Sequence, residues 1–249
     1  MPDATVTSET GSATIRPEEA HFFGALAADW WDPAGSSAML HKLNPVRLKF
    51  LREAVDMHWG GDIESVRPLA GKVVLDVGCG AGLLTEPLAR LGGEVTGVDA
   101  SPENTRAAAA HSEGAGLDIR YIPGELGSLG LGHFDLVTSM EVIEHVADKQ
   151  AFAVQLAAHL APGGVMVLST PNRTLASRAL LVEAAEASGM VPKGTHDWHD
   201  FVTPEELENL LEAAGLEMGN PQGVAWSPSK GLHLSDDLSL NYIVTARHA

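Results

Sequence analysis

One stretch of the chain, KVVLDVGCGAG over residues 72–82, limits the possible folds more than any other. Its first part, 72–77, is almost continuously apolar and rich in β-branched residues, as in a strand buried on both faces. Its second part places glycines at 78, 80 and 82, where a turn would lead into a helix. Strands buried on both faces occur mainly in parallel sheets covered by helices, so the stretch predicts an α/β fold.

The rest of the chain continues this alternation of strands and helices. Further strands are expected at 94–99, 118–122, 133–140, 165–170, 216–225 and 240–247. Helices are expected at about 82–91, from Ser101-Pro102 onward, and at 142–160, 175–188 and 204–214. The pattern predicts one mostly parallel sheet of seven strands with helices on both faces.

Two helical segments precede the first strand. His21–Trp31 carries apolar residues at mixed helical spacing and ends in a turn at Asp32-Pro33. A second helix is expected over 44–57, because Asn44 is a favoured N-cap residue and Pro45 suits the first helical position.

The first twenty residues are polar and lack helical or strand periodicity. We expect a flexible tail over 1–20, followed by a single domain over 21–249. The tail has no apolar signal core and holds one arginine against four acids, the wrong balance for an organelle transit peptide. The single cysteine, Cys79, cannot form an intrachain disulfide, which fits a reducing compartment. The expected location is the bacterial cytoplasm.

The charge and the apolar pattern argue against several classes of function. The formal net charge of −17 at pH 7 argues against nonspecific binding to nucleic acid. No run of eighteen or more apolar residues appears, so no segment is expected to span a membrane. A local basic patch could still bind either nucleic acid or anionic lipid.

Two nucleotide ligands compete for the glycine-rich turn. A nicotinamide dinucleotide fingerprint needs G-x-G-x-x-G, but residue 83 is Leu, and the third glycine arrives one position early. Asp76, two residues before the first glycine, suits the amino group of S-adenosylmethionine better than a pyrophosphate. Asp99 ends the second strand, 21 residues after Gly78, where a carboxylate can accept hydrogen bonds from both ribose hydroxyls. The turn therefore favours S-adenosylmethionine, the alternative being a tight turn without a ligand.

The turn DVGCGAG, with GVDAS after the second strand, resembles class I (Rossmann-like) methyltransferases. More specifically, five segments resemble the ubiquinone-biosynthesis O-methyltransferase family: WWDP, LHKLNPVRL, TSMEVIEHV, STPNR and MVPKGTHDWHDF. The resemblance covers nearly all of the chain after the tail, and NPVRL and VPKGTHDW are its specific motifs because generic methyltransferases lack them. It implies the class I fold with an antiparallel C-terminal strand.

The resemblance also implies an activity, the transfer of a methyl group from S-adenosylmethionine to phenolic hydroxyls of polyprenylated ubiquinone precursors. Two steps are expected, from 2-polyprenyl-6-hydroxyphenol to 2-methoxy-6-polyprenylphenol and from 3-demethylubiquinol to ubiquinol. A methyltransferase for another small phenol or acid is one alternative, and a noncatalytic cofactor-binding protein on the same scaffold is another. Association with other ubiquinone-biosynthesis proteins is a further expectation.

Individual residues of the cofactor site can be carried over from the family. Arg47, in NPVRL, matches a cofactor-contacting arginine and is expected to meet the methionine carboxylate bidentately. Gly78 and Asp99 match the turn glycine and the ribose acid, and Met140 matches a methionine lining the site. The predicted cofactor-binding residues are Arg47, Asp76, Gly78, Gly80, Gly82, Asp99, Ser101 and Met140.

A second candidate site follows the fourth expected strand, at the edge of the sheet where α/β proteins bind ligands. Glu141, Glu144 and His145 stand at i, i+3 and i+4, so a helix would bring them to one face. The family carries a magnesium-type site on these positions, so the resemblance implies that they hold Mg²⁺ and act catalytically by activating the phenol. Imidazole is a less typical ligand for so hard a cation, so His145 is alternatively the general base. A helix start with acids favoured by the helix dipole is the third interpretation.

The segment 172–196 is expected to be an insertion that contains an amphipathic helix. Its basic residues Arg173, Arg178 and Lys193 outnumber its acidic residues, which is unusual in so acidic a chain. The helix either packs on the core or lies at a membrane interface, and the resemblance favours the interface, with a peripheral place on the inner membrane. The residues expected to flank the substrate entrance are His196, Asp197 and His199.

Overall fold

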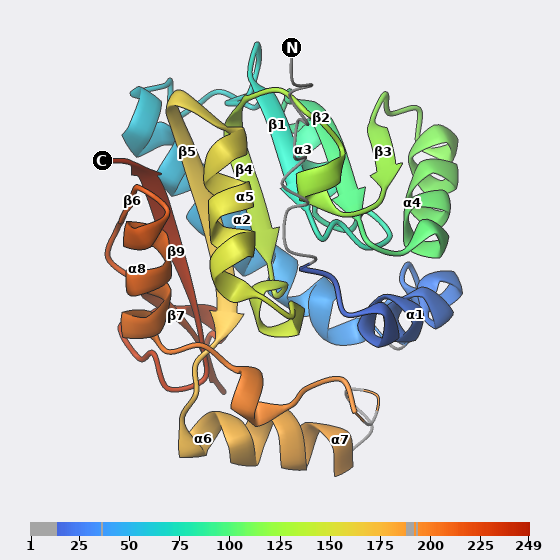
Figure 1. The fold of residues 1–249 in the computed structure, drawn as a ribbon, viewed down its shortest axis with the longest axis vertical. Coiled ribbons are helices and arrows are strands. Elements are labelled where there is room, and N and C mark those ends of the chain that lie inside the picture. The colour runs from blue at the N-terminus through green and yellow to red at the C-terminus, as the bar shows by residue number, and fades with distance from the viewer. Residues whose placement is uncertain (1–13, 36, 188–191, 193) are drawn as a thin grey trace, which may run out of the picture.

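The computed structural model describes residues 14–249 except 36, 188–191 and 193. The described residues form one nine-stranded sheet in the order β3-β2-β1-β4-β5-β9-β7-β8, with β6 paired to β9 (Figure 1). The strands are β1 Val73–Val77, β2 Glu94–Asp99, β3 Arg120–Pro123, β4 Phe134–Met140, β5 Leu160–Pro171, β6 Leu216–Met218, β7 Gln222–Ser227, β8 Gly231–Ser235 and β9 Asn241–His248.

The parallel half of the sheet consists of β1 to β5, with β1 at its centre. β1 pairs in parallel with β2 on one side and with β4 on the other, and β4 pairs in parallel with β5. Val74 and Leu75 of β1 are fully buried on opposite faces, as the apolar run predicts. The carboxyl ends of β1, β2 and β4 therefore meet at one edge of the sheet, where the glycine turn begins.

The other strands are antiparallel. β9 runs antiparallel to β5, β6 and β7, which confirms the expected antiparallel C-terminal strand. The strand predicted over 216–225 is wrong as one element: it is broken into β6 and β7 around Gly219 and Pro221, since proline lacks the N–H that a central strand needs. β8 has no counterpart among the predicted strands, so nine strands replace the expected seven.

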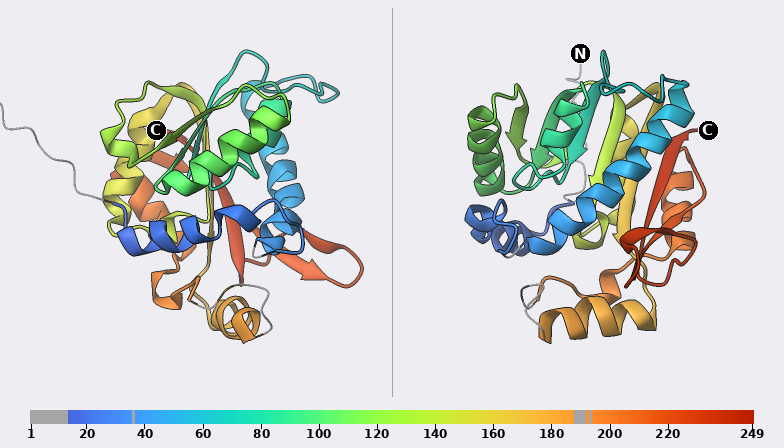
Figure 2. Two further views of the ribbon diagram at one scale, coloured as in Figure 1. Left: turned by 90° about the vertical axis from the view of Figure 1, so that its right-hand side faces the viewer. Right: turned by 180° about the vertical axis from the view of Figure 1, so that it is seen from behind.

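Helices cover both faces of the sheet (Figure 2). One face packs against α5 and α8, which contribute Phe152, Leu156 and Leu207 to its core, and the other packs against α2, which contributes Phe50 and Leu51. The helices are α1 Pro17–Ala25, η1 Ala27–Asp29, α2 Ala38–Trp59, α3 Thr85–Arg90, α4 Pro102–Gly114, η2 Leu126–Ser128, η3 Ile143–His145, α5 Lys149–His159, α6 Leu175–Ser177, η4 Arg178–Ala184, α7 Ala185–Ala187, η5 Trp198–Asp200 and α8 Pro204–Ala213.

α2 begins at Ala38, so the predicted start at Asn44 is wrong. Pro45 lies inside the helix, where its missing N–H removes one helical hydrogen bond. Asn44 is buried, and its side-chain Nδ2 donates to the backbone oxygen of Leu83, 2.9 Å away. Burial of the apolar face of α2 outweighs the cost of the proline. The hydrogen bond from Asn44 holds the N-terminal half of the helix against the glycine turn.

The predicted tail is too long, because α1 begins at Pro17, and Thr14 and Arg16 just before it make contacts with the domain. Thr14 is only 2% exposed, and its hydroxyl donates to a carboxylate oxygen of Glu125, 2.9 Å away. Arg16 pairs with Asp200 at 2.5 Å, which joins this segment to η5. These contacts involve residues more than a hundred positions apart, which local periodicity does not reveal.

Within the predicted insertion, residues 175–187 extend from the end of the sheet as a helical arm (Figure 1). The predicted helix is present over α6, η4 and α7, of which η4 has π-helical hydrogen bonding, while Lys193 lies outside the described residues. Leu175 and Leu180 on this arm are 77% and 53% exposed. No helix within the described ranges is both long and apolar enough to cross a membrane.

Candidate active site

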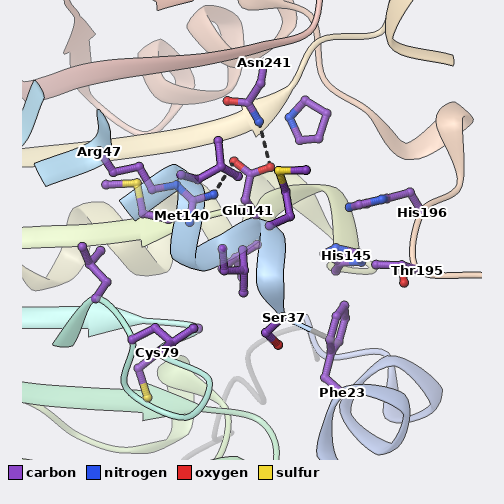
Figure 3. Close-up of a pocket in the computed structure, with 18 of the residues that line it drawn as sticks. Phe23, Ser37, Arg47, Cys79, Met140, Glu141, His145, Thr195, His196 and Asn241 are labelled. Carbon is purple, nitrogen blue, oxygen red and sulfur yellow. Dashed lines mark hydrogen bonds and ion pairs between the residues drawn. The ribbon is translucent and has the colours of Figure 1, made fainter. Parts of the chain in front are cut away.

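A cavity of about 1040 Å³ lies at the carboxyl ends of β1, β2 and β4 (Figure 3). One part of it is lined by Gly78, Asp99 and Arg47, and another by His145 and His196. Further lining comes from α1, the helical arm and the β7–β8 hairpin. The cavity thus joins the predicted cofactor site to the predicted catalytic site.

The glycine turn is built so that side chains would not fit. Gly78 and Gly80 have φ values of +73° and +53°, in the left-handed region that glycine adopts at little cost. A Cβ added to Gly78 would lie 2.3 Å from Val142, and one added to Gly80 would lie 2.2 Å from the Trp30 ring. Gly78 lines the cavity, whereas Gly80 and Gly82 shape the turn behind it.

Asp99 is held rigidly beside the turn. Its two carboxylate oxygens accept hydrogen bonds from the backbone N–H groups of Gly80 and Ser101, each at 2.9 Å, and Asn104 Nδ2 donates at 3.1 Å. Burial raises the pKa of Asp99, although these hydrogen bonds oppose the rise. Ser101 is the N-cap of α4 and lies outside the cavity lining, so its structural role is helix capping. Asn104, which lines the cavity, was missed from the sequence.

Asp76 is buried below the turn and already satisfied by protein hydroxyls. Thr138 and Thr85 each donate to one of its oxygens at 2.7 Å, which ties β1 to β4 and to the start of α3. Burial raises the pKa of Asp76 to about 6. The carboxylate lines the cavity, but its first role is to hold these three elements together.

Arg47 places a buried guanidinium in the wall of the cavity. The side chain is 5% exposed, and its Nη2 lies 3.3 Å from Glu141 Oε1 without a hydrogen-bond partner among the described residues. Met140, 9% exposed, ends β4 beside it (Figure 3). A buried cation with an unsatisfied N–H fits an anionic ligand such as the methionine carboxylate.

The predicted common helical face of Glu141, Glu144 and His145 is wrong. Glu141 has φ +57°, and only a short 3₁₀ turn, η3, follows before α5 starts at Lys149. The left-handed turn at Glu141 separates its carboxylate from the other two side chains. Ser169 Oγ donates to Glu141 Oε1 at 2.6 Å and Asn241 Nδ2 donates to Oε2 at 2.8 Å, so Glu141 faces Arg47 and β9 (Figure 3).

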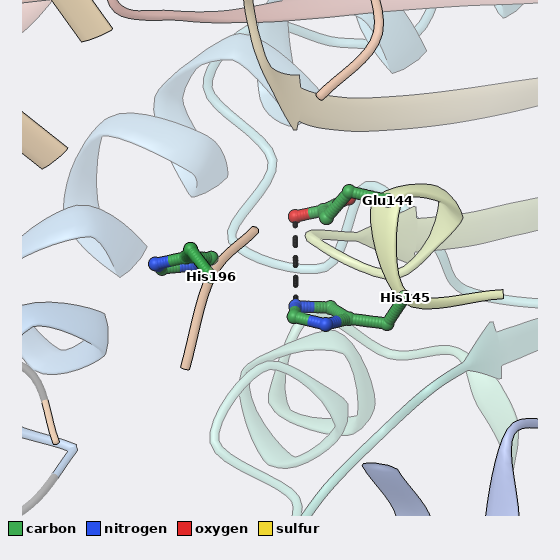
Figure 4. Close-up of side chains that lie close together, drawn as sticks. All are labelled: Glu144, His145 and His196. Atoms are coloured by element: carbon green, nitrogen blue, oxygen red, sulfur yellow. Dashed lines mark ion pairs between the residues drawn. The ribbon is translucent and has the colours of Figure 1, made fainter. Parts of the chain in front are cut away.

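Glu144, His145 and His196 form a separate cluster, with one ligating atom of each within 4.8 Å of the others (Figure 4). Thr170 donates to Glu144 Oε2 at 2.9 Å, and Oε1 has no hydrogen-bond partner in the described chain. Burial and the charge of Glu141 raise the pKa of Glu144 to about 7.

The pKa values of the two histidines in this cluster are shifted in opposite directions. Burial lowers the pKa of His145, but its hydrogen bond to Glu19 and the charge of Glu144 outweigh burial, so the net shift is upward. Burial and the neighbouring His145 lower the pKa of His196 to about 4, so His196 is neutral at pH 7.

The cluster does not fit the predicted magnesium site. Glu141 lies outside it, and its two oxygens already accept hydrogen bonds from Ser169 and Asn241. The donors that remain together are one carboxylate and two imidazoles, whereas Mg²⁺ prefers oxygen ligands. The arrangement is better suited to proton transfer by His145, whose Nε2 lies in the cluster.

Several residues that shape the site carry only weak signals in the sequence. Trp31 stacks on His111 with ring centroids 3.4 Å apart and donates its Nε1 to the oxygen of Ala81, which holds the N-terminal segment against the glycine turn. The WWDP run is a recognisable motif, but no residue close to it in sequence indicates that Trp31 stacks on His111. Glu19 and Asn241 have no distinguishing motif, and long-range packing alone brings them to the site.

Comparison with known proteins agrees with this geometry. A family model described as a methyltransferase domain matches residues 58–219. The ubiquinone biosynthesis O-methyltransferase of Sinorhizobium medicae is 45% identical over 244 residues, covering 96% of this chain and 98% of that protein. The protein of the same name from Caulobacter vibrioides is 46% identical, covering 96% of both chains.

Solved structures share the fold at lower identity. An S-adenosylmethionine-dependent methyltransferase from Aquifex aeolicus matches with a TM-score of 0.59 and 17% identity, covering 91% of this chain and 97% of that one. The magnesium protoporphyrin IX methyltransferase of Synechocystis, solved with bound S-adenosylhomocysteine, matches with a TM-score of 0.56 and 21% identity, covering 82% and 85%. The fold is therefore that of S-adenosylmethionine-dependent methyltransferases, and the chain belongs to the ubiquinone biosynthesis O-methyltransferase family.

Proposed function

We propose that this protein transfers the methyl group of S-adenosylmethionine to phenolic oxygens of polyprenylated ubiquinone precursors, at both O-methylation steps. The observation that carries the proposal is the single cavity that joins the buried Arg47 guanidinium and the glycine turn to His145. Relatives 42–46% identical over almost the whole chain carry the name of this activity.

The cofactor end of the cavity offers partners for the carboxylate and the nucleoside of S-adenosylmethionine. Arg47 is placed to bind the carboxylate and Asp99 to accept hydrogen bonds from the ribose, with Asn104 beside it. Asn104 Oδ1 is buried without a partner among the described residues, so it is available to accept a hydrogen bond from the nucleoside. S-adenosylmethionine supplies an electrophilic methyl group, and the turn leaves room for it because glycines replace side chains there.

The acceptor end must remove a proton, because a phenol with an ordinary pKa near 10 is mostly protonated at neutral pH. His145 Nε2 accepts this proton as the oxygen–methyl bond forms and the methyl–sulfur bond breaks, giving the methyl ether and S-adenosylhomocysteine. His145 is only 15% exposed, so bulk water competes weakly with the phenol for this nitrogen. Holding oxygen, methyl and sulfur in line supplies the rest of the catalysis.

The test is methyl transfer by the purified protein to a short-chain prenyl catechol and to a demethylated quinol, followed by mass spectrometry. Methylation of both acceptors supports the proposal. Methylation of unrelated small phenols alone supports the alternative acceptor class, and cofactor binding without turnover on any phenol indicates a noncatalytic protein. Accumulation of the unmethylated catechol or the demethylated quinol in a deletion strain tests the same assignment in the cell.

The binding of Mg²⁺ as a cofactor stays a prediction. The one carboxylate and two imidazoles of the cluster do not favour this ion. Metal-stripped protein that keeps its full rate in chelator, with no gain from added Mg²⁺, excludes the metal role. A rate that falls when the metal is stripped and returns with Mg²⁺ supports a catalytic role for the metal. It also shows that His145 does not activate the phenol alone.

We also propose a cytoplasmic, peripheral association with the inner membrane through the helical arm. Leu180 on the arm and Trp226 on β7 line the cavity and are 53% and 65% exposed, so an apolar mouth faces outward. Arg173 and Arg178 each pair with a glutamate, which weakens the positive charge expected of the arm.

Liposome flotation with anionic vesicles tests this association. Substituting Arg173 and Arg178 by Glu should reduce the floated fraction, and Trp226→Ala should reduce it further by removing apolar contact. Arg106→Glu on exposed α4, the same charge change as either arm substitution made singly, is the control. Flotation that none of the arm and hairpin changes alters would exclude this surface, and co-purification would test association with other ubiquinone-biosynthesis proteins.

A further inference from the structure

The ring of His145 is held from α1, a helix whose first residues the sequence assigns to a tail. Glu19 Oε2 of α1 lies 3.2 Å from His145 Nδ1. The Phe23 ring, one turn further along the same helix, packs edge-on against the imidazole, with centroids 5.0 Å apart and planes at 80°. Both residues line the cavity, as does His145 itself. The two contacts together define where the imidazole lies and how it is turned. Figure 3 shows Phe23 and His145 on this side of the cavity.

The segment that carries Glu19 is anchored on both sides of the active site. The oxygen of Thr14 accepts a hydrogen bond from the backbone N–H of Ala147, two residues after His145, at 2.8 Å. Both terminal guanidinium nitrogens of Arg16 donate to Asp200, at 2.5 and 3.0 Å. Glu19 is therefore presented to His145 by a docked helix rather than by a free side chain of a mobile chain end.

The contact decides which nitrogen of His145 carries the hydrogen. A carboxylate only accepts hydrogen bonds, so Glu19 selects the tautomer with the hydrogen on Nδ1 and a lone pair on Nε2. Nε2 lies 4.0 Å from Glu144 Oε1, too far for a hydrogen bond, so it remains available to the acceptor. An acid that orients a histidine in this way is the arrangement by which serine hydrolases prepare their general base.

We propose that Glu19 is a positioning residue for methyl transfer, which fixes the ring orientation and the tautomer of His145 so that Nε2 can take the phenolic proton. This inference rests on the function proposed above. It makes the N-terminal helix a part of the active site.

The kinetic test compares Glu19→Gln with Glu19→Asp. Gln keeps the length of the side chain, but its amide offers both a donor and an acceptor to Nδ1, so it no longer selects the tautomer with the hydrogen on Nδ1. Asp is shorter but stays an acceptor. We expect kcat to fall about 10- to 100-fold in Glu19→Gln, to fall less in Glu19→Asp, and the KM for S-adenosylmethionine to stay within about twofold. Glu18→Gln, on the exposed side of the same helix, is the matched control.

The acidity of the acceptor provides a readout that a structural role would not change. A nitro-substituted catechol is far more acidic and is ionised in large part near neutral pH, so the loss in Glu19→Gln should shrink for it relative to the unsubstituted short-chain prenyl catechol. Equal losses on both acceptors, or greater activity in Glu19→Gln than in Glu19→Asp, would overturn the proposal.

A second measurement needs no turnover and separates this inference from the proposed function. The ¹⁵N chemical shifts of the histidine ring, assigned by comparison with His145→Gln, distinguish the two neutral tautomers. The wild type should show hydrogen on Nδ1, and Glu19→Gln should shift the population toward Nε2. An unchanged tautomer in Glu19→Gln overturns the positioning role even if neither catechol is methylated, whereas a wild type with the expected tautomer and no methylation fails the proposed function alone.

Discussion

Replacing Arg47 with methionine should separate the recognition of the cofactor's amino-acid part from that of its adenosine. The guanidinium is buried in the cavity wall, and its Nη2 has no hydrogen-bond partner among the described residues. Methionine fills a similar volume without charge. The change therefore removes the proposed carboxylate contact and leaves the glycine turn and Asp99 intact.

The size of the effect follows from the surroundings of Arg47. Truncating one side of a buried, charge-assisted hydrogen-bonded pair costs on the order of 2–5 kcal/mol. The ligand carboxylate must share the guanidinium with Glu141, which lies 3.3 Å from it. We therefore expect the lower part of that range, about 2–3 kcal/mol, or a Kd for S-adenosylhomocysteine raised about 30- to 150-fold.

Isothermal titration calorimetry with two ligands provides the test. S-adenosylhomocysteine carries the carboxylate, whereas 5′-methylthioadenosine has the same nucleoside and sulfur without the amino-acid part. Arg47→Met should weaken the first and leave the second within about twofold. Arg106→Met, on exposed α4, should change neither. Equal weakening of both ligands would refute the carboxylate contact and indicate that Arg47 acts by shaping the cavity.

Three further changes test the turn and its supports. Burial raises the pKa of Asp76 from 3.8 to about 6, so about 3 kcal/mol of stability that is present below pH 4 is lost as the pH rises through 6. In urea unfolding, the free energy of unfolding of Asp76→Asn should fall less between pH 4 and 7 than that of the wild type. An equal fall in the two proteins would contradict the assignment. Gly80 has φ +53°, and a Cβ there would lie 2.2 Å from Trp30. Gly80→Ala should therefore lose at least about 1–3 kcal/mol of stability and bind S-adenosylhomocysteine poorly. Unchanged melting and binding would contradict the steric argument. Trp31→Ala should remove the stack on His111 and lower stability by about 1–3 kcal/mol. It should also speed the release of S-adenosylhomocysteine in stopped-flow measurements. An unchanged release rate would mean that Trp31 does not hold the N-terminal segment in place.

Local sequence patterns predicted the parallel half of the fold well. The apolar run at 72–77 forms β1, and the glycine at 78 adopts the left-handed turn that follows it. The acid at the end of the second strand is Asp99, the last residue of β2. This succeeded because a strand buried on both faces and a left-handed glycine turn impose requirements on consecutive residues, which appear directly in the sequence.

The errors at α2 and at the end of β4 share one cause, which is competition between local propensity and contacts formed far along the chain. Asn44 and Pro45 have the residue types of a helix start, yet the helix begins at Ala38, and Asn44 is buried inside it with its side chain bonded to the oxygen of Leu83. Glu141 and His145 have helical spacing, but the backbone takes a left-handed turn at Glu141, whose carboxylate is held by Arg47, Ser169 and Asn241. The helix predicted over 142–160 therefore starts only at Lys149.

The sequence by itself determined the α/β class, the glycine turn and, through its resemblance, the methyltransferase family. Only the tertiary structure decided which side chains meet: Glu141 turns toward Arg47, His196 joins Glu144 and His145, and Glu19 reaches the imidazole from α1. The physical reason is the range of the interactions. Backbone geometry and burial patterns constrain neighbours in sequence, whereas the orientation of these side chains depends on partners that packing brings from 51 to 126 residues away.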